Sequence, residues 1–114
     1  MRTVPAGQAP KLSKSRLESM VEDATIDANG ESEQVGGFFT MIDEHLHLPF
    51  TTTVLGVEVI VTKVDMTEAD EIVVVCRRGK ETQRLSILDL PLPAPPPEGA
   101  EWVAAYRYWR RGGR

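Results

Sequence analysis

The sequence predicts an α+β protein in which two N-terminal helices pack on a small antiparallel SH3-like β-barrel and a C-terminal helix follows. Apolar residues recur every three or four positions up to Leu46, and β-branched residues dominate from Thr51. Helical spacing returns after a proline-rich connector. With 114 residues and 41% hydrophobic residues, the chain has material for one core. We therefore expect one domain over residues 13–114, preceded by a flexible tail over residues 1–12.

Two amphipathic helices are expected before the strands. Ser15 and Glu18 have the spacing of a capping box, which marks the start of the first helix. Its apolar face is formed by Leu17, Met20, Val21 and Ala24. A second helix is expected from about Glu31 to Leu46, and "LPF" at positions 48–50 ends it because proline disfavours a helical residue before it. The apolar face of this second helix is formed by Val35, Phe38, Phe39, Ile42 and Leu46.

The central third of the chain predicts three or four antiparallel strands. "TTTVLGVEVIVTKVD" is rich in β-branched residues and is broken by Gly56, while "EIVVVCRR" and "QRLSILDL" flank "GKET" as a hairpin. Short strands with a glycine kink suit a closed barrel better than an open sheet with exposed edges. Cys76 is the single cysteine, which excludes an intrachain disulfide and favours a buried structural thiol.

A third helix is expected at the C-terminal end. "PLPAPPPEGA" reads as a polyproline connector whose composition does not contribute to a core. In "EWVAAYRYWRR" four residues share one helical face, which we expect to dock on the barrel as core, with Gly112 just beyond the helix end. These four residues are Trp102, Ala105, Tyr106 and Trp109.

Charge and missing motifs narrow the function classes. The net charge is −4, with most acidic residues between Glu18 and Glu71, which disfavours general nucleic-acid binding and suits a cation partner. No apolar run approaches the length of a membrane span, and the N-terminus lacks the features of a secretory signal, so we expect a cytoplasmic protein without membrane contact. The common catalytic signatures are absent, so we do not expect an enzyme.

The stretch "DANGESE", residues 27–33, is the strongest candidate for a metal site. Asp27, Asn29, Glu31 and Glu33 alternate with smaller residues, so their oxygen atoms can project to one side, and Ca²⁺ prefers such oxygen ligands. An EF-hand loop is excluded, because glycine is at the fourth position instead of the sixth and Phe38 replaces the final glutamate. An alternative remains open: Asn29 or Ser32 caps the second helix, and the glutamates complement its first turn.

A second acidic group is expected at the other end of the second helix. Asp43 and Glu44 stand there, and the strand connection "VDMTEADE" supplies Asp65. A helix of about 15 residues is about 22 Å long, so Glu31 and Glu44 cannot share one ion, and two separate sites are implied. An ordinary acidic turn is the alternative for the strand connection. His45 and His47 diverge on a helix, which disfavours a zinc or nickel site.

The order of these motifs resembles the small cyanobacterial calcium-binding protein family, the CcbP-like proteins. The resemblance rests on "ATIDANGESEQ", "FF" before "LPF", "VLGVEVIVTKVD", "CRRG" and "AAYRYW", and it runs from about Ala24 to Trp109. It implies an acidic, non-EF-hand protein that binds calcium through surface carboxylates. Asp27, Glu31 and Glu33 match the acidic motif, whereas Asn29 stands where an aromatic residue is expected. Asp43, Glu44 and Asp65 match more loosely.

We therefore expect a calcium-binding domain that acts as a low-affinity Ca²⁺ buffer or sensor through clustered surface carboxylates. The alternative is an SH3-like interaction module for a protein or a nucleic acid. That module would use the basic hairpin with Arg77 and Arg78 together with the C-terminal helix.

Overall fold

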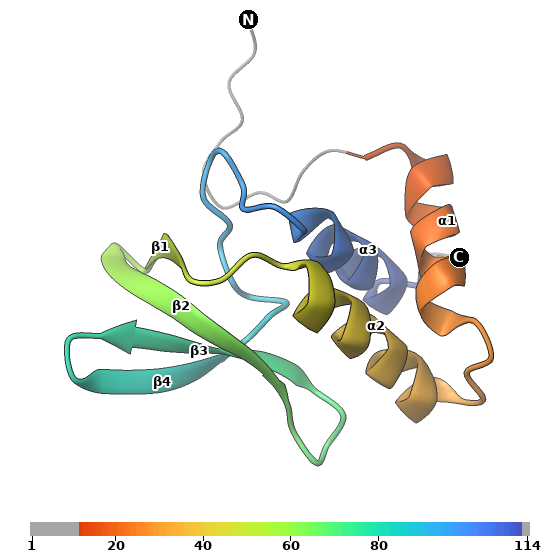
Figure 1. Cartoon of the computed structure of the whole chain (residues 1–114), viewed down its shortest axis with the longest axis horizontal. Helices are drawn as coiled ribbons and strands as arrows, with labels where there is room; N and C mark the ends of the chain where they lie inside the picture. Colours follow the sequence, from red (N-terminus) through yellow and green to blue (C-terminus); the bar gives the residue numbers. More distant parts are fainter. Residues whose placement is uncertain (1–11, 113–114) are drawn as a thin grey trace, which may run out of the picture.

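The computed structural model describes residues 12–112, which form three helices and four strands (Figure 1). The elements are α1 (Lys14–Thr25), α2 (Glu31–His45), β1 (Phe50–Val54), β2 (Val57–Met66), β3 (Ile72–Arg78), β4 (Glu81–Ser86) and α3 (Ala100–Arg110). The α+β class is confirmed. The tail predicted for residues 1–12 lies outside the described residues, except for Leu12, which packs partly buried against the core.

The boundaries of the first two helices follow from local sequence. The hydroxyl of Ser13 accepts a hydrogen bond from the Arg16 amide at 3.0 Å, so α1 begins before Ser15, and the predicted capping box at Ser15 is wrong. The predicted apolar face is confirmed at its centre, where Met20 is fully buried. The second helix begins at Glu31 as predicted, and Leu46 forms its C-cap.

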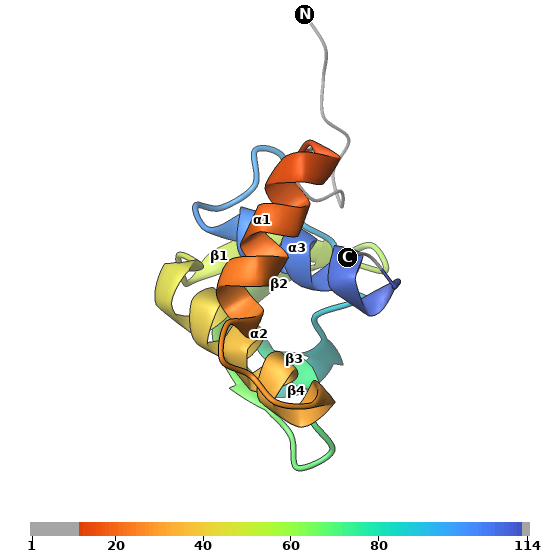
Figure 2. The same ribbon diagram turned by 90° about the vertical axis from the view of Figure 1, so that its right-hand side faces the viewer.

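The three helices form one side of the molecule. The outermost helix, α1, packs on both α2 and α3, while α2 also contacts β2 (Figure 2). Gly37 permits the close approach of α1 and α2, because a Cβ atom at this position would lie 1.9 Å from the carbonyl oxygen of Ala24. The sequence predicts that both N-terminal helices pack directly on the sheet. In the structure α1 instead packs on the other two helices.

The strands form an open antiparallel sheet in the order β1-β2-β3-β4. Within the described chain β1 and β4 are edge strands with no ladder between them, so the predicted SH3-like barrel is not closed. Gly56 does not kink a strand. Together with Leu55 it forms the two-residue turn between β1 and β2, and both residues have positive φ angles, 50° and 78°.

The segment after β4 explains why the barrel stays open. Leu92 belongs to the predicted polyproline connector, yet it is fully buried, as are Ile87 and Leu90. Arg107 of α3 donates hydrogen bonds to the carbonyl oxygens of Ile87 and Leu90. The chain therefore turns into the core after β4 instead of continuing as a closing strand, and the expectation that the connector contributes nothing to the core is wrong.

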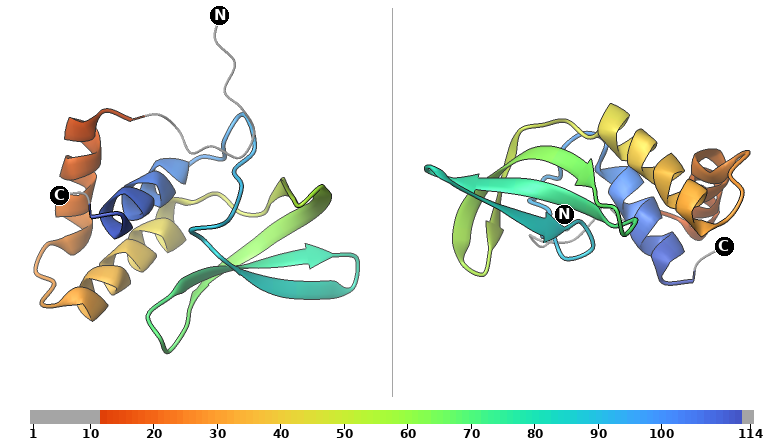
Figure 3. Two further views of the ribbon diagram at one scale, coloured as in Figure 1. Left: turned by 180° about the vertical axis from the view of Figure 1, so that it is seen from behind. Right: turned by 90° about the horizontal axis from the view of Figure 1, so that it is seen from below.

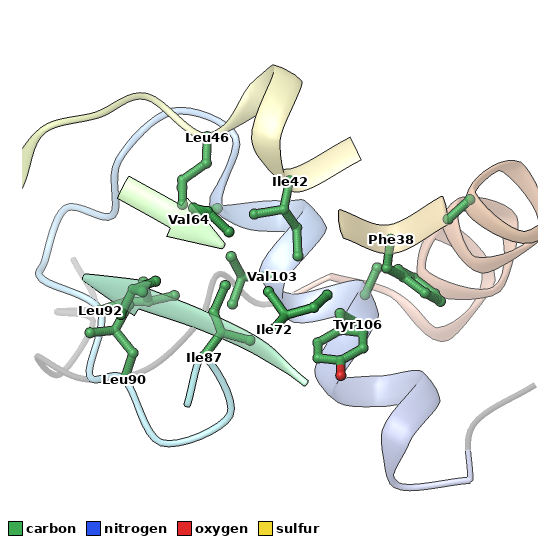
Figure 4. Close-up of a cluster of buried hydrophobic side chains, with 14 of the residues drawn as sticks. Phe38, Ile42, Leu46, Val64, Ile72, Ile87, Leu90, Leu92, Val103 and Tyr106 are labelled. Atoms are coloured by element: carbon green, nitrogen blue, oxygen red, sulfur yellow. The ribbon is translucent and has the colours of Figure 1, made fainter. Parts of the chain in front are cut away.

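The core lies between the helices and the sheet (Figure 4). Ile42 of α2, Val64 of β2 and Val103 of α3 meet there, and all three are buried. On α3, Tyr106 is 1% exposed, whereas Trp102 and Trp109 are partly buried at its margin, as expected for a core-facing helix. The predicted buried thiol of Cys76 is also confirmed.

Candidate functional site

The loop between α1 and α2 holds the first predicted metal ligands at the surface. Asp27 has a φ angle of 61° in the left-handed region, and the Ala28 amide donates to the carbonyl oxygen of Thr25 at 3.0 Å, so the chain turns immediately after α1. Gly30, with a φ angle of 88°, is the N-cap of α2 and offers no capping side chain. Asp27 and Asn29 are both exposed on this loop.

Glu33 folds back from the first turn of α2 onto the loop before it. Its Oε1 atom accepts a hydrogen bond from the backbone amide of Asn29 at 2.8 Å. The side chain thus reaches back over the first turn of α2 as in a capping box, displaced by one residue. The alternative is confirmed in placing Glu31 and Glu33 in the first turn of α2, but its caps are wrong, because Gly30 and neither Asn29 nor Ser32 is the N-cap.

Glu31 is connected to the C-terminal helix. Its Oε2 atom lies 3.2 Å from Nη1 of Arg110, and the Glu31 side chain is 75% exposed. The same guanidinium lies over the rings of Tyr106 and Trp109, at 5.9 and 5.8 Å from the ring centroids. Arg110 therefore links the acidic loop to the aromatic margin of the core, a contact between positions 79 residues apart that no local sequence pattern indicates.

The second predicted group is divided between two surfaces. Asp43 and Glu44 are exposed in the last turn of α2. Asp65 pairs with Val73, one position along from the buried pair of Val64 and Val74, so its side chain points away from the core-facing side of the sheet. There its Oδ2 atom lies 3.3 Å from Nη2 of Arg84.

The donor atoms fit a hard cation in their chemistry but are not gathered in this conformation. Within residues 12–112, no group of three or more histidine, cysteine, aspartate or glutamate side chains is close enough together to hold a metal ion. Glu31, Glu33 and Asp65 are each engaged by a protein donor. The assignment of the seven residues as ligands therefore stays a prediction.

The remaining candidate groups have ordinary structural partners. His45 stacks on Trp102, with ring centroids 5.7 Å apart, and the backbone amide of His47 donates to the carbonyl oxygen of Glu98. Burial lowers the pKa of Arg107, whose guanidinium is held by backbone carbonyls. No helix in the described part of the chain is long and apolar enough to cross a membrane.

The fold is similar to that of two solved structures. The crystal structure of CcbP from Anabaena is 17% identical in sequence, and it matches with a TM-score of 0.67 over 90% of this chain and 95% of that chain. A structure described as a calcium-binding protein in the calcium-binding form is 19% identical, with a TM-score of 0.67 over 91% of this chain and 99% of that chain. No protein-family model and no curated protein sequence matches the chain. The resemblance to the CcbP-like family is therefore confirmed at the level of the fold.

Proposed function

We propose that this protein binds Ca²⁺ weakly, without being an enzyme, and acts as a buffer or low-affinity sensor. The observation that carries the proposal is the shared fold: 91% of this chain matches 99% of a protein described in its calcium-binding form. The motif order that resembles the CcbP-like family supports the same function. The proposed ligands are Asp27, Asn29, Glu31 and Glu33.

The chemistry of the α1–α2 loop supports this choice of ligands. Its side chains offer carboxylate and amide oxygens to solvent, which Ca²⁺ prefers. The hydrogen bonds and ion pairs between described residues do not involve the side chains of Asp27 or Asn29, so both can accept a cation without losing a protein partner. Asp27 stands in a left-handed turn four positions before Glu31, the first residue of α2.

The two glutamates explain why the proposed affinity is weak. Arg110 holds Oε2 of Glu31 and the Asn29 amide holds Oε1 of Glu33, so a bidentate contact of either carboxylate with the ion requires that its partner be released. An exposed ion pair contributes about 0.2–1 kcal/mol and a hydrogen bond to a charged group about 1.5–3 kcal/mol, and both reduce the binding free energy. Water must also supply several of the six to eight oxygens that Ca²⁺ takes.

Calorimetric titration with Ca²⁺ tests the proposal. We expect weak saturable binding to the wild-type protein and at least a severalfold loss of affinity in Asp27→Asn. Glu58→Gln is the matched control, because it also removes one exposed carboxylate but lies on β2 in the sheet. Equal losses in both variants, or no heat of binding at millimolar Ca²⁺, contradict the proposed site.

A further inference from the structure

A groove opens on the inner face of the sheet beyond the helices. It has a volume of about 680 Å³, and Val57, Val59, Cys76 and Leu85 contribute to its apolar lining. These side chains alternate along their strands in phase with Val61 and Val74, which the core covers. Figure 3 shows from two further sides that the β1–β2 and β3–β4 turns extend past the helices. The groove thus continues the core-facing side past the helices, where Val57 is exposed and Val59 and Leu85 are only partly buried.

The groove reaches an edge of the sheet where backbone groups are free to pair. The amide of Ile87 donates to the carbonyl oxygen of Ile72 at 3.0 Å, which fixes the hydrogen-bonding phase between β3 and β4. In an antiparallel ladder, alternate residues direct their amides to the same side, so Thr82 and Arg84 direct theirs away from β3. Both residues line the groove. No described strand pairs with this side of β4.

The β3–β4 hairpin that borders the groove is basic, opposite in sign to the whole protein, although Arg77 lies on the other face of the sheet. The β3–β4 hairpin carries four basic residues against the single carboxylate of Glu81, although the net charge of the chain is −4. The four are Arg77, Arg78, Lys80 and Arg84. Arg84 pairs with Asp65, whereas Arg78 lines the groove and takes part in no ion pair among the described residues. This local charge favours an acidic partner.

We propose that the groove binds an extended acidic segment of a partner protein, which adds as a strand beside β4. Its backbone pairs with the outward amides of Thr82 and Arg84, alternate apolar side chains enter the groove, and its carboxylates face Arg78 and Lys80. The exposed apolar turn residue Leu55, 97% exposed, extends the apolar surface at one end. This interaction does not depend on the calcium proposal.

Two other occupants fit the groove less well. A single-stranded nucleic acid needs aromatic faces on which bases stack, and no aromatic side chain lines the groove. A second copy of the chain would offer its own edge strands, but β1 contains no carboxylate, and in β4 one glutamate is balanced by one arginine. Neither strand is the acidic segment that the basic hairpin favours.

Fluorescence anisotropy with labelled peptides tests the proposal. The probes are capped peptides of about ten residues in which valine, isoleucine, leucine or phenylalanine alternates with glutamate or aspartate, a length that covers one strand. Matched peptides carry lysine in place of the acid, and a thymidine oligonucleotide serves as the nucleic-acid probe. We expect acidic peptides to bind best, with at least a tenfold loss of affinity in Val57→Glu and in Arg78→Glu. Lys14→Glu makes the same charge change on α1 and should alter the affinity less than twofold.

Amide hydrogen exchange locates the bound strand. On addition of the best acidic peptide, the amides of Thr82 and Arg84 should become protected, whereas Gln83, which already faces β3, should change little. Tighter binding of the lysine peptides or of the oligonucleotide, or unchanged affinity in Val57→Glu, would overturn the proposal. So would self-association that Val57→Glu abolishes, because a second copy would then occupy the groove.

Discussion

The adjacent glycines of α2 provide the sharpest test of the helical packing that positions the acidic loop. A Cβ atom at Gly37 would lie 1.9 Å from the backbone oxygen of Ala24, about 1.5 Å closer than ordinary van der Waals contact, and neither backbone can rotate away. Gly37→Ala must therefore push α1 from α2. We expect a loss of about 3 kcal/mol in the free energy of unfolding, at the upper end of the usual cost of overpacking.

Gly36→Ala is the matched control, because it makes the same chemical change one position earlier. Nothing lies within 4 Å of a Cβ atom at Gly36, so the substitution only improves helix propensity, by about 0.5–1 kcal/mol. Urea denaturation of both variants measures the difference in the free energy of unfolding. If Gly37→Ala is as stable as Gly36→Ala, the close contact between α1 and α2 is refuted.

Two further predictions concern Arg110 and alkaline pH. Arg110→Gln should raise Ca²⁺ affinity by up to about fivefold, because it releases Glu31 from an ion pair of about 0.2–1 kcal/mol. Arg111→Gln removes the same charge without touching Glu31 and should raise the affinity less in the same titration. An equal gain in both variants would show that only net charge matters. Burial raises the pKa of the Cys76 thiol, so the folded state holds this proton more tightly than the unfolded state. The free energy of unfolding, measured by urea denaturation, should therefore fall as pH rises through the alkaline range, and it should fall less steeply with pH in Cys76→Ser. An identical pH dependence in the wild type and in Cys76→Ser would contradict a role of the thiol.

Local patterns predicted the helices and strands well, because the periodicity that marks a helix or a strand is set by residues close in sequence. The spacing of Val35, Phe38 and Ile42 placed α2 correctly, and all three side chains are buried. Closure of the barrel could not be predicted in this way. After β4 the chain enters the core instead of forming a closing strand. Leu92 is buried although its stretch has the composition of a connector, and the hydrogen bonds to the Ile87 carbonyl come from Arg107, 20 positions away.

The acidic loop shows the same division between local and distant effects. The position of Glu33 in the first turn of α2 was predicted from local sequence, and its contact with the Asn29 amide spans only four residues. The partner of Glu31 comes from the other end of the chain, where Arg110 is held over Trp109. A sequence pattern identifies oxygen donors, but it does not show which of them already have a cationic partner.

A Ca²⁺ titration followed by backbone amide NMR tests the central proposal most directly. We expect the largest saturable shifts on residues 27–33, followed by the indole signal of Trp109 as Arg110 loses Glu31. Residues of the β3–β4 hairpin should shift little. An unchanged spectrum at millimolar Ca²⁺, or shifts centred away from the α1–α2 loop, would contradict it.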